Sequence, residues 1–149
     1  MTDQTAENGF SWGRAVAIGL AVSVLTALIA QIMLRAGVSP LPKPPSLAFA
    51  ETLAGRALPL PVGLLFHTAY VTFWSLVYLR VSPRHGGVPV LILAGLLWLG
   101  VLIVFFPVVG WGFAGTAISV KLIPASAIPH LLFALFLWAG ERLLPPARG

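Results

Sequence analysis

The 149-residue chain has no cysteine, and charged residues make up only 9% of it. The lack of cysteine excludes disulfides, thiolate nucleophiles, iron–sulfur clusters and cysteine-ligated zinc. Soluble domains carry about 25% charged residues. A chain with so little charge cannot cover a surface that faces water, so its surroundings must be largely hydrocarbon.

Acidic residues are the scarcest charged type, with four Asp and Glu against nine Lys and Arg. Asp3 and Glu7 lie in a polar tail, Glu51 lies in a loop and Glu141 stands next to Arg142, so the sequence offers no paired carboxylates for acid–base catalysis. The cations are scattered singly, which argues against a nucleic-acid partner despite the net charge of +5. Motifs of metalloproteases, P-loops and nucleophile elbows are absent as well. We therefore expect neither a catalytic residue nor a metal site.

Long hydrophobic runs account for most of the remaining sequence, of which 58% is hydrophobic. Each run approaches or exceeds the roughly 20 residues that cross a bilayer core as a helix, and none alternates like a barrel strand. We predict an all-α, polytopic membrane protein with four transmembrane helices in an up-down bundle. The expected parts are a polar tail at 1–13, a transmembrane domain at 14–144 with spans at about 15–36, 58–80, 88–109 and 122–142, and a C-terminal tail at 145–149.

The positions of Lys and Arg in short loops predict the orientation of a membrane protein. One side holds Arg14, Arg80, Arg84, Arg142 and Arg148, and the other holds Arg35, Lys43, Arg56 and Lys121. The turn at residues 80–87 has the composition of a cytoplasmic hairpin. We therefore expect a multi-pass protein of the bacterial inner membrane with both termini in the cytoplasm.

Two connections are more than simple tethers. Residues 38–45 contain four prolines, which predicts a stiff spacer. Ser46 is expected to cap a short helix that runs to Ala57 and lies against the membrane, with Phe49 and Ala50 among its lipid-facing residues. Residues 110–121 are apolar but broken by glycines, so the sequence leaves open whether they are interfacial or re-entrant.

Two histidines interrupt the second and fourth runs in the same local pattern. His67 and His130 each follow a proline by six residues and precede aromatic residues by three and six, in segments offset by 63 residues. This repetition makes the chain a candidate for a duplicated two-helix hairpin, whose halves would be related by an axis along the membrane normal.

Both histidines are expected at one depth, because the second and fourth helices run in the same direction. The helical rise places each ring about 9–12 Å below the outer boundary, level with Gln31 near the end of the first helix. We predict a polar cluster inside the bundle, in the outer leaflet, formed by Gln31, His67, Tyr70 and His130.

Small residues predict where the helices pack closely. Gly19, Ser23 and Ala27 recur every four residues on the first helix, and Gly63 precedes the histidine of the second. Small residues let helix backbones approach each other in lipid, where the hydrophobic effect does not drive association.

Three interpretations of the histidines remain open. Each ring can act as polar glue, donating to a backbone carbonyl or to Gln31. Alternatively, His67 and His130 are axial ligands of haem b, with Gly63 allowing the macrocycle to approach. As a third alternative, the cluster marks a path for protons or small solutes, although the sequence places no second acid at mid-depth.

Part of the chain resembles a family of small bacterial and archaeal membrane proteins, the YagU-like and related uncharacterised four-helix families. The resemblance covers roughly residues 60–140 and rests on the segments FFPVVGWGFAG and PHLLFALFLWAG. The matching positions are His67, Pro107, Gly110, Gly112, Phe113, Gly115 and His130, whereas Val71 and Ala134 stand where the family often has glycine. The resemblance implies a four-helix inner-membrane protein and supplies no activity.

From these observations we expect a non-catalytic accessory or assembly subunit of a larger membrane complex. Its partners would be the lipid bilayer and either other membrane-protein subunits or further copies of the chain. The alternatives are a haem b electron-transfer module and a permeation protein.

Overall fold

The computed structural model describes residues 10–82 and 86–144. The tail residues 1–9 and 145–149 and the turn residues 83–85, with His85, lie outside the described part. Four helices of the described part are long and apolar enough to cross a membrane, which confirms the predicted fold class. They are α1 (Trp12–Arg35), α3 (Leu60–Val81), the continuous run of α4 (Gly87–Gly100), η1 (Val101–Phe105) and α5 (Phe106–Val108), and α6 (Leu122–Leu143).

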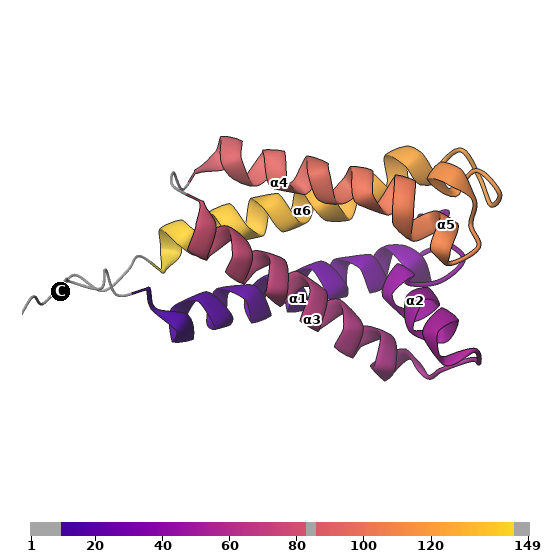
Figure 1. Cartoon of the computed structure of the whole chain (residues 1–149), viewed down its shortest axis with the longest axis horizontal. Helices are drawn as coiled ribbons and strands as arrows, with labels where there is room; N and C mark the ends of the chain where they lie inside the picture. Colours follow the sequence, from indigo (N-terminus) through magenta and orange to yellow (C-terminus); the bar gives the residue numbers. More distant parts are fainter. Residues whose placement is uncertain (1–9, 83–85, 145–149) are drawn as a thin grey trace, which may run out of the picture.

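The four spans form an up-down bundle in which α1 packs against both α3 and α6, and α6 packs against α4 (Figure 1). The start of α1 and the end of α6 lie at the same end of the bundle, which we call the termini end. The short helix α2 (Pro45–Ala54) lies at the opposite end, the α2 end. Because α1–α3 and α4–α6 are the closest neighbours, each half of the chain forms a helix pair, although duplication itself stays a prediction.

The contact between α1 and α3 depends on a residue without a side chain. A Cβ added to Gly19 would lie 3.0 Å from Cα of Thr72 and 3.3 Å from Cβ of Ser75, so the two backbones nearly touch there. Ser23 is fully buried one turn further on. Ala27, the third small residue of this row, is half-buried and faces a cavity described below.

Apolar side chains from all four spans fill the half of the bundle nearer the termini. Ile18, Val90 and Leu137 are at most 1% exposed and belong to one continuous core cluster. This core holds the spans together at the termini end, and its members Val71, Leu97 and Phe133 lie where it meets the cavity described below.

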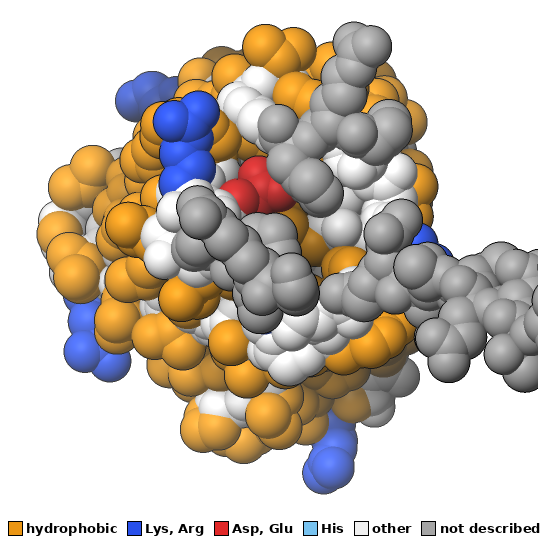
Figure 2. All heavy atoms as spheres, turned by 90° about the vertical axis from the view of Figure 1, so that its left-hand side faces the viewer, with side chains coloured by type: hydrophobic (Ala, Val, Ile, Leu, Met, Phe, Trp, Pro, Cys, Tyr) orange, Lys and Arg blue, Asp and Glu red, His pale blue; other side chains and the backbone are white. Residues whose placement is uncertain are grey.

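The termini end carries a small polar network. The Tyr78 hydroxyl lies 3.4 Å from Oε2 of Glu141, and it also bonds the backbone of Gly86. Figure 2 views this end and shows acidic atoms near the centre of a mostly hydrophobic face. The guanidinium of the neighbouring Arg142 lies over the ring of Trp138, 4.4 Å from the centroid.

Helix α2 packs against protein and not against lipid alone, which corrects the expectation from sequence. Ala50, expected to face lipid, is only 2% exposed, and Leu47 packs on Gly63 of α3. Phe49 stacks on Phe105 of η1 with ring centroids 5.4 Å apart. The helix begins at Pro45 and ends at Ala54, so the serine that follows Pro45 lies inside the first turn and does not cap it.

The third span changes its winding before it ends. Residues Val101–Phe105 are π-helical, and the N–H of Phe106 bonds the carbonyl of Val101. Pro107 follows directly, and a proline ring clashes with the carbonyl four residues earlier, so the wider turn accommodates it. The segment whose placement the sequence left open then folds back onto the bundle, with Trp111 only 6% exposed against Phe106.

Candidate functional site

A cavity of about 330 Å³ lies between the four spans in the half of the bundle nearer α2. It exposes mainly carbon atoms, and the Pro-rich linker and Phe49 of α2 form part of its wall. Its polar lining residues are Thr26, Gln31, Ser39, Lys43, Ser46, His67, Tyr70, Ser126 and His130.

The structure brings all four residues of the expected polar cluster to this one cavity. Gln31, His67, Tyr70 and His130 line it from three different helices. The two histidines are half-buried, whereas Tyr70 is 45% exposed and so faces partly outward. No hydrogen bond joins any two of the four within the described residues, so they share a wall and do not form a bonded cluster.

His67 connects α3 to α1. Its Nε2 lies 3.1 Å from the carbonyl oxygen of Ser23 and 3.1 Å from Oγ1 of Thr26. A carbonyl oxygen only accepts, so Nε2 carries the proton and donates it. The Thr26 hydroxyl donates in turn to the carbonyl of Val22 at 2.8 Å. The ring therefore acts as polar glue between two spans, as the simplest interpretation of the sequence expects.

His130 bonds within its own helix instead. Its Nδ1 lies 2.7 Å from the carbonyl oxygen of Ser126, which by the same reasoning makes Nδ1 the protonated nitrogen. The Ser126 hydroxyl accepts a bond from Nε1 of Trp98 at 3.1 Å and donates to the carbonyl of Ile123. This small network ties the start of α6 to α4 beside the cavity.

The two rings thus use opposite nitrogens for their protons. Nδ1 of His67 and Nε2 of His130 have no hydrogen-bond partner among the residues that the structure describes. In a neutral imidazole the unprotonated nitrogen is an acceptor. The cavity wall therefore carries two unpaired acceptors and no imidazole donor.

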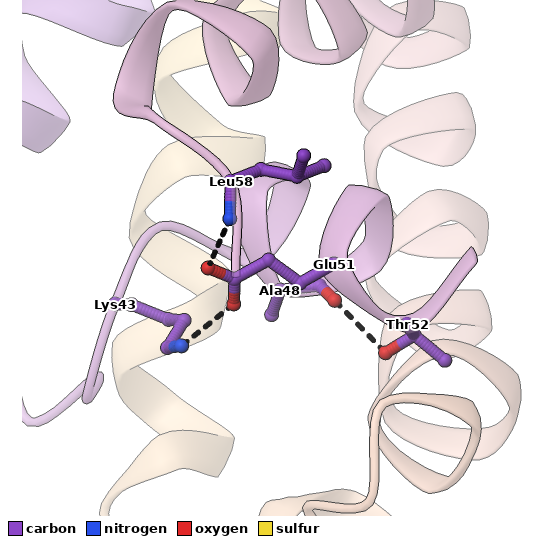
Figure 3. A network of polar contacts seen from close by, with 5 residues as sticks. All are labelled: Lys43, Ala48, Glu51, Thr52 and Leu58. Atoms are coloured by element: carbon purple, nitrogen blue, oxygen red, sulfur yellow. Dashed lines mark hydrogen bonds and ion pairs between the residues drawn. The ribbon is translucent and has the colours of Figure 1, made fainter. Parts of the chain in front are cut away.

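A salt bridge fixes the linker and α2 beside the cavity (Figure 3). Nζ of Lys43 lies 2.7 Å from Oε2 of Glu51, and Oε1 accepts the backbone N–H of Leu58 at 3.2 Å. The Lys43 ammonium, followed by the Leu58 N–H, lowers the pKa of the Glu51 carboxyl below its usual value. One carboxylate thus ties the chain before α2 to the chain after it.

Haem b stays a prediction. Each histidine keeps one ring nitrogen free, Nδ1 of His67 and Nε2 of His130, while the other donates to a backbone carbonyl, as is usual for a metal-ligating histidine. The space beside Gly63, which was expected to let a macrocycle approach, is occupied by α2. A Cβ added to Gly63 would lie 2.7 Å from Cβ of Leu47. The described residues also contain no group of three or more side chains suited to hold a metal ion.

The cavity does not extend toward the acidic residue at the termini end. Its lining stops at Thr26 on α1 and at Phe133 on α6. Leu137 is fully buried between Phe133 and Glu141 on α6. A continuous polar path between the histidines and Glu141 is therefore not formed within the described residues.

Three residues that contribute to the site were not predicted from the sequence to do so. Thr26 lies three residues after Ser23, on the same helical face, and this spacing was the available signal for a second α1 partner of the histidine. Trp98 lies within an apolar run, where nothing in the sequence marks it as a partner of Ser126. Phe49 was expected at the lipid surface, and nothing in its local pattern distinguishes lipid from a protein wall.

Comparison of the chain with protein families, curated proteins and solved structures gives no match.

Proposed function

We propose that this integral membrane protein binds a small lipid-soluble molecule in the cavity between its four spans. The observation that supports the proposal is the cavity itself, which has a volume of about 330 Å³, mainly carbon walls and a few polar groups. These are the properties of small-molecule sites, whose volumes begin near 300 Å³. Since the walls belong to membrane spans, the ligand would come from the hydrocarbon phase.

The close packing around the cavity supports the interpretation of the cavity as a binding site. Protein interiors are close-packed, and the neighbouring core leaves Ile18 and Leu137 almost without exposed surface. Helix α2 adds Phe49 to the wall, and the bridge from Lys43 to Glu51 holds that helix in place. An apolar ligand would restore van der Waals contacts that the cavity walls lack.

A matched pair of substitutions on α1 tests the proposal. Ala27 is half-buried and lines the cavity, whereas Ala21, on the same helix, is exposed and does not line it. We expect Ala27→Phe to occupy the cavity and weaken ligand binding at least tenfold, while Ala21→Phe leaves binding unchanged. Suitable probes are 1-decanol and decyl methyl ether, because the cavity has room for about eleven water-sized groups of about 30 Å³.

Native mass spectrometry of the detergent-solubilised chain would count bound probe molecules, and thermal unfolding would verify that each variant folds. If Ala27→Phe fails to fold, Ala30→Phe, which also lines the cavity but is more exposed, replaces it. Equal retention of the probes by both phenylalanine variants, or no retention by the unmodified chain, would contradict the proposal.

Other expectations from the sequence stay predictions beside this one. They are the role as accessory or assembly subunit, the bacterial inner membrane as location, the cytoplasmic side for the termini, and membership of the YagU-like families. A cavity ligand is compatible with each of them. The haem alternative also stays a prediction, whereas permeation has less support, because Leu137 is fully buried between the histidines and Glu141.

A further inference from the structure

We infer that the ligand of the cavity is an uncharged amphiphile that donates a hydrogen bond, with a hydroxyl head group as the simplest case. This inference rests on the proposed function and specifies the chemistry of the same site.

The acceptor character of the wall follows from two main-chain carbonyls. The carbonyl of Ser23 fixes the proton of His67 on Nε2, and the carbonyl of Ser126 fixes that of His130 on Nδ1. The nitrogen that remains on each ring has a lone pair and no partner among the described residues. Neither nitrogen is fully buried, so each is accessible to a ligand, and a ligand that donates to it gains a hydrogen bond that one without a donor cannot form.

The charge of the wall argues for a neutral head group. Lys43 is the single cation among the lining residues, and its ammonium is paired with Glu51 at 2.7 Å. A carboxylate head would therefore find no free cation, and its oxygens would lie beside acceptor nitrogens. A carbonyl or ether head is also disfavoured, because it presents lone pairs to lone pairs. A hydroxyl meets both conditions, since its proton is directed at the ring nitrogen.

Three probes of equal chain length separate these cases. We would measure binding of 1-decanol, decyl methyl ether and decanoate to the full chain in the same detergent, by native mass spectrometry and by the shift in unfolding temperature. One hydrogen bond to a neutral group corresponds to about a fivefold difference in affinity. We expect 1-decanol to bind about fivefold more tightly than the ether, and decanoate to bind more weakly than both.

Two variants test whether the imidazole nitrogens are responsible. His130→Phe and His67→Phe keep a ring at each position but remove both ring nitrogens and with them the acceptors Nε2 and Nδ1. The double variant should bind 1-decanol and the ether within about twofold of each other. Binding of the ether should change little, which a general loss of structure would not produce.

The outcomes distinguish this inference from the proposed function. If the ether binds as tightly as the alcohol, or decanoate binds more tightly, the inference is overturned while the cavity remains a binding site. If the double variant keeps the full preference for the alcohol, the histidines are not its source and the inference fails as well. If none of the three probes binds, both the inference and the proposed function are wrong.

Discussion

Replacing Gly63 by alanine tests whether α2 is held in place by close contact with α3. An added Cβ would lie 2.7 Å from Cβ, 2.9 Å from Cα and 3.0 Å from the backbone nitrogen of Leu47. Carbon atoms in contact normally lie 3.5–4.0 Å apart. Two of these three atoms belong to the backbone, so a change of rotamer cannot relieve the clash and α2 must move by nearly an ångström.

The energetic cost follows from two opposing effects. Adding a methyl group to a well-packed contact costs about 1–3 kcal/mol. Alanine in place of glycine within a helix returns up to about 1 kcal/mol. We therefore expect Gly63→Ala to lower the free energy of unfolding by about 1–2 kcal/mol. Gly95→Ala on α4 is the control, because a Cβ there meets nothing within 4 Å and should not destabilise the chain.

Two measurements distinguish movement of α2 from a general loss of stability. Denaturant unfolding in micelles gives the free energy for both variants. The chain has no cysteine, so a pair of cysteines at Leu53 and Leu65, which are 64% and 69% exposed, can carry spin labels without background. We expect a longer label distance in Gly63→Ala only. Equal stability of the two alanine variants, with unchanged label distances, would refute the close contact.

Two further predictions concern polar groups. The hydroxyl of Thr72 is buried without a hydrogen-bond partner, so Thr72→Val should keep or raise stability, whereas Thr26→Val should lower it by about 1 kcal/mol because His67 loses a partner; thermal unfolding of both variants checks this. The pKa of Glu51 is lowered in the folded chain, so its stabilising effect is complete above the unfolded value of 4.5 and is lost as pH falls through the folded value. Glu51→Gln should therefore be less stable than the unmodified chain at pH 7, and unfolding measured down to pH 3 should show this difference disappear.

The fold could be predicted because its main determinant is local. A run such as the third span, Gly87–Val108, has a mean hydropathy of 2.8, and length and composition alone identify it as a membrane-crossing helix. The depth of His67 and His130 also follows from counting residues along helices that run in the same direction. Both residues consequently line one cavity with Gln31 and Tyr70.

The placement of α2 could not be predicted, because an apolar face fits lipid and protein equally well. Ala50 is buried by other parts of the chain, and its partners are distant in the sequence. Gly63 carried a usable signal of close packing, yet the sequence does not say whether the approaching backbone is a neighbouring span, a cofactor or α2. The tautomers of the two histidines could not be predicted from the sequence either, because each depends on a carbonyl whose position only the folded chain defines.

The matched sequence pattern around the two histidines also hides a difference in their bonding. His67 donates across to α1, whereas His130 donates to Ser126 of its own helix, where Pro129 interrupts the backbone hydrogen bonds of α6. Each ring N–H must find a carbonyl, because an unpaired donor in a membrane interior costs several kcal/mol. The two solutions differ in geometry, but each leaves one lone pair without a partner on a residue that lines the cavity. Acceptor character at both rings therefore follows from satisfying their protons locally, and it does not require the two halves of the chain to share an ancestor.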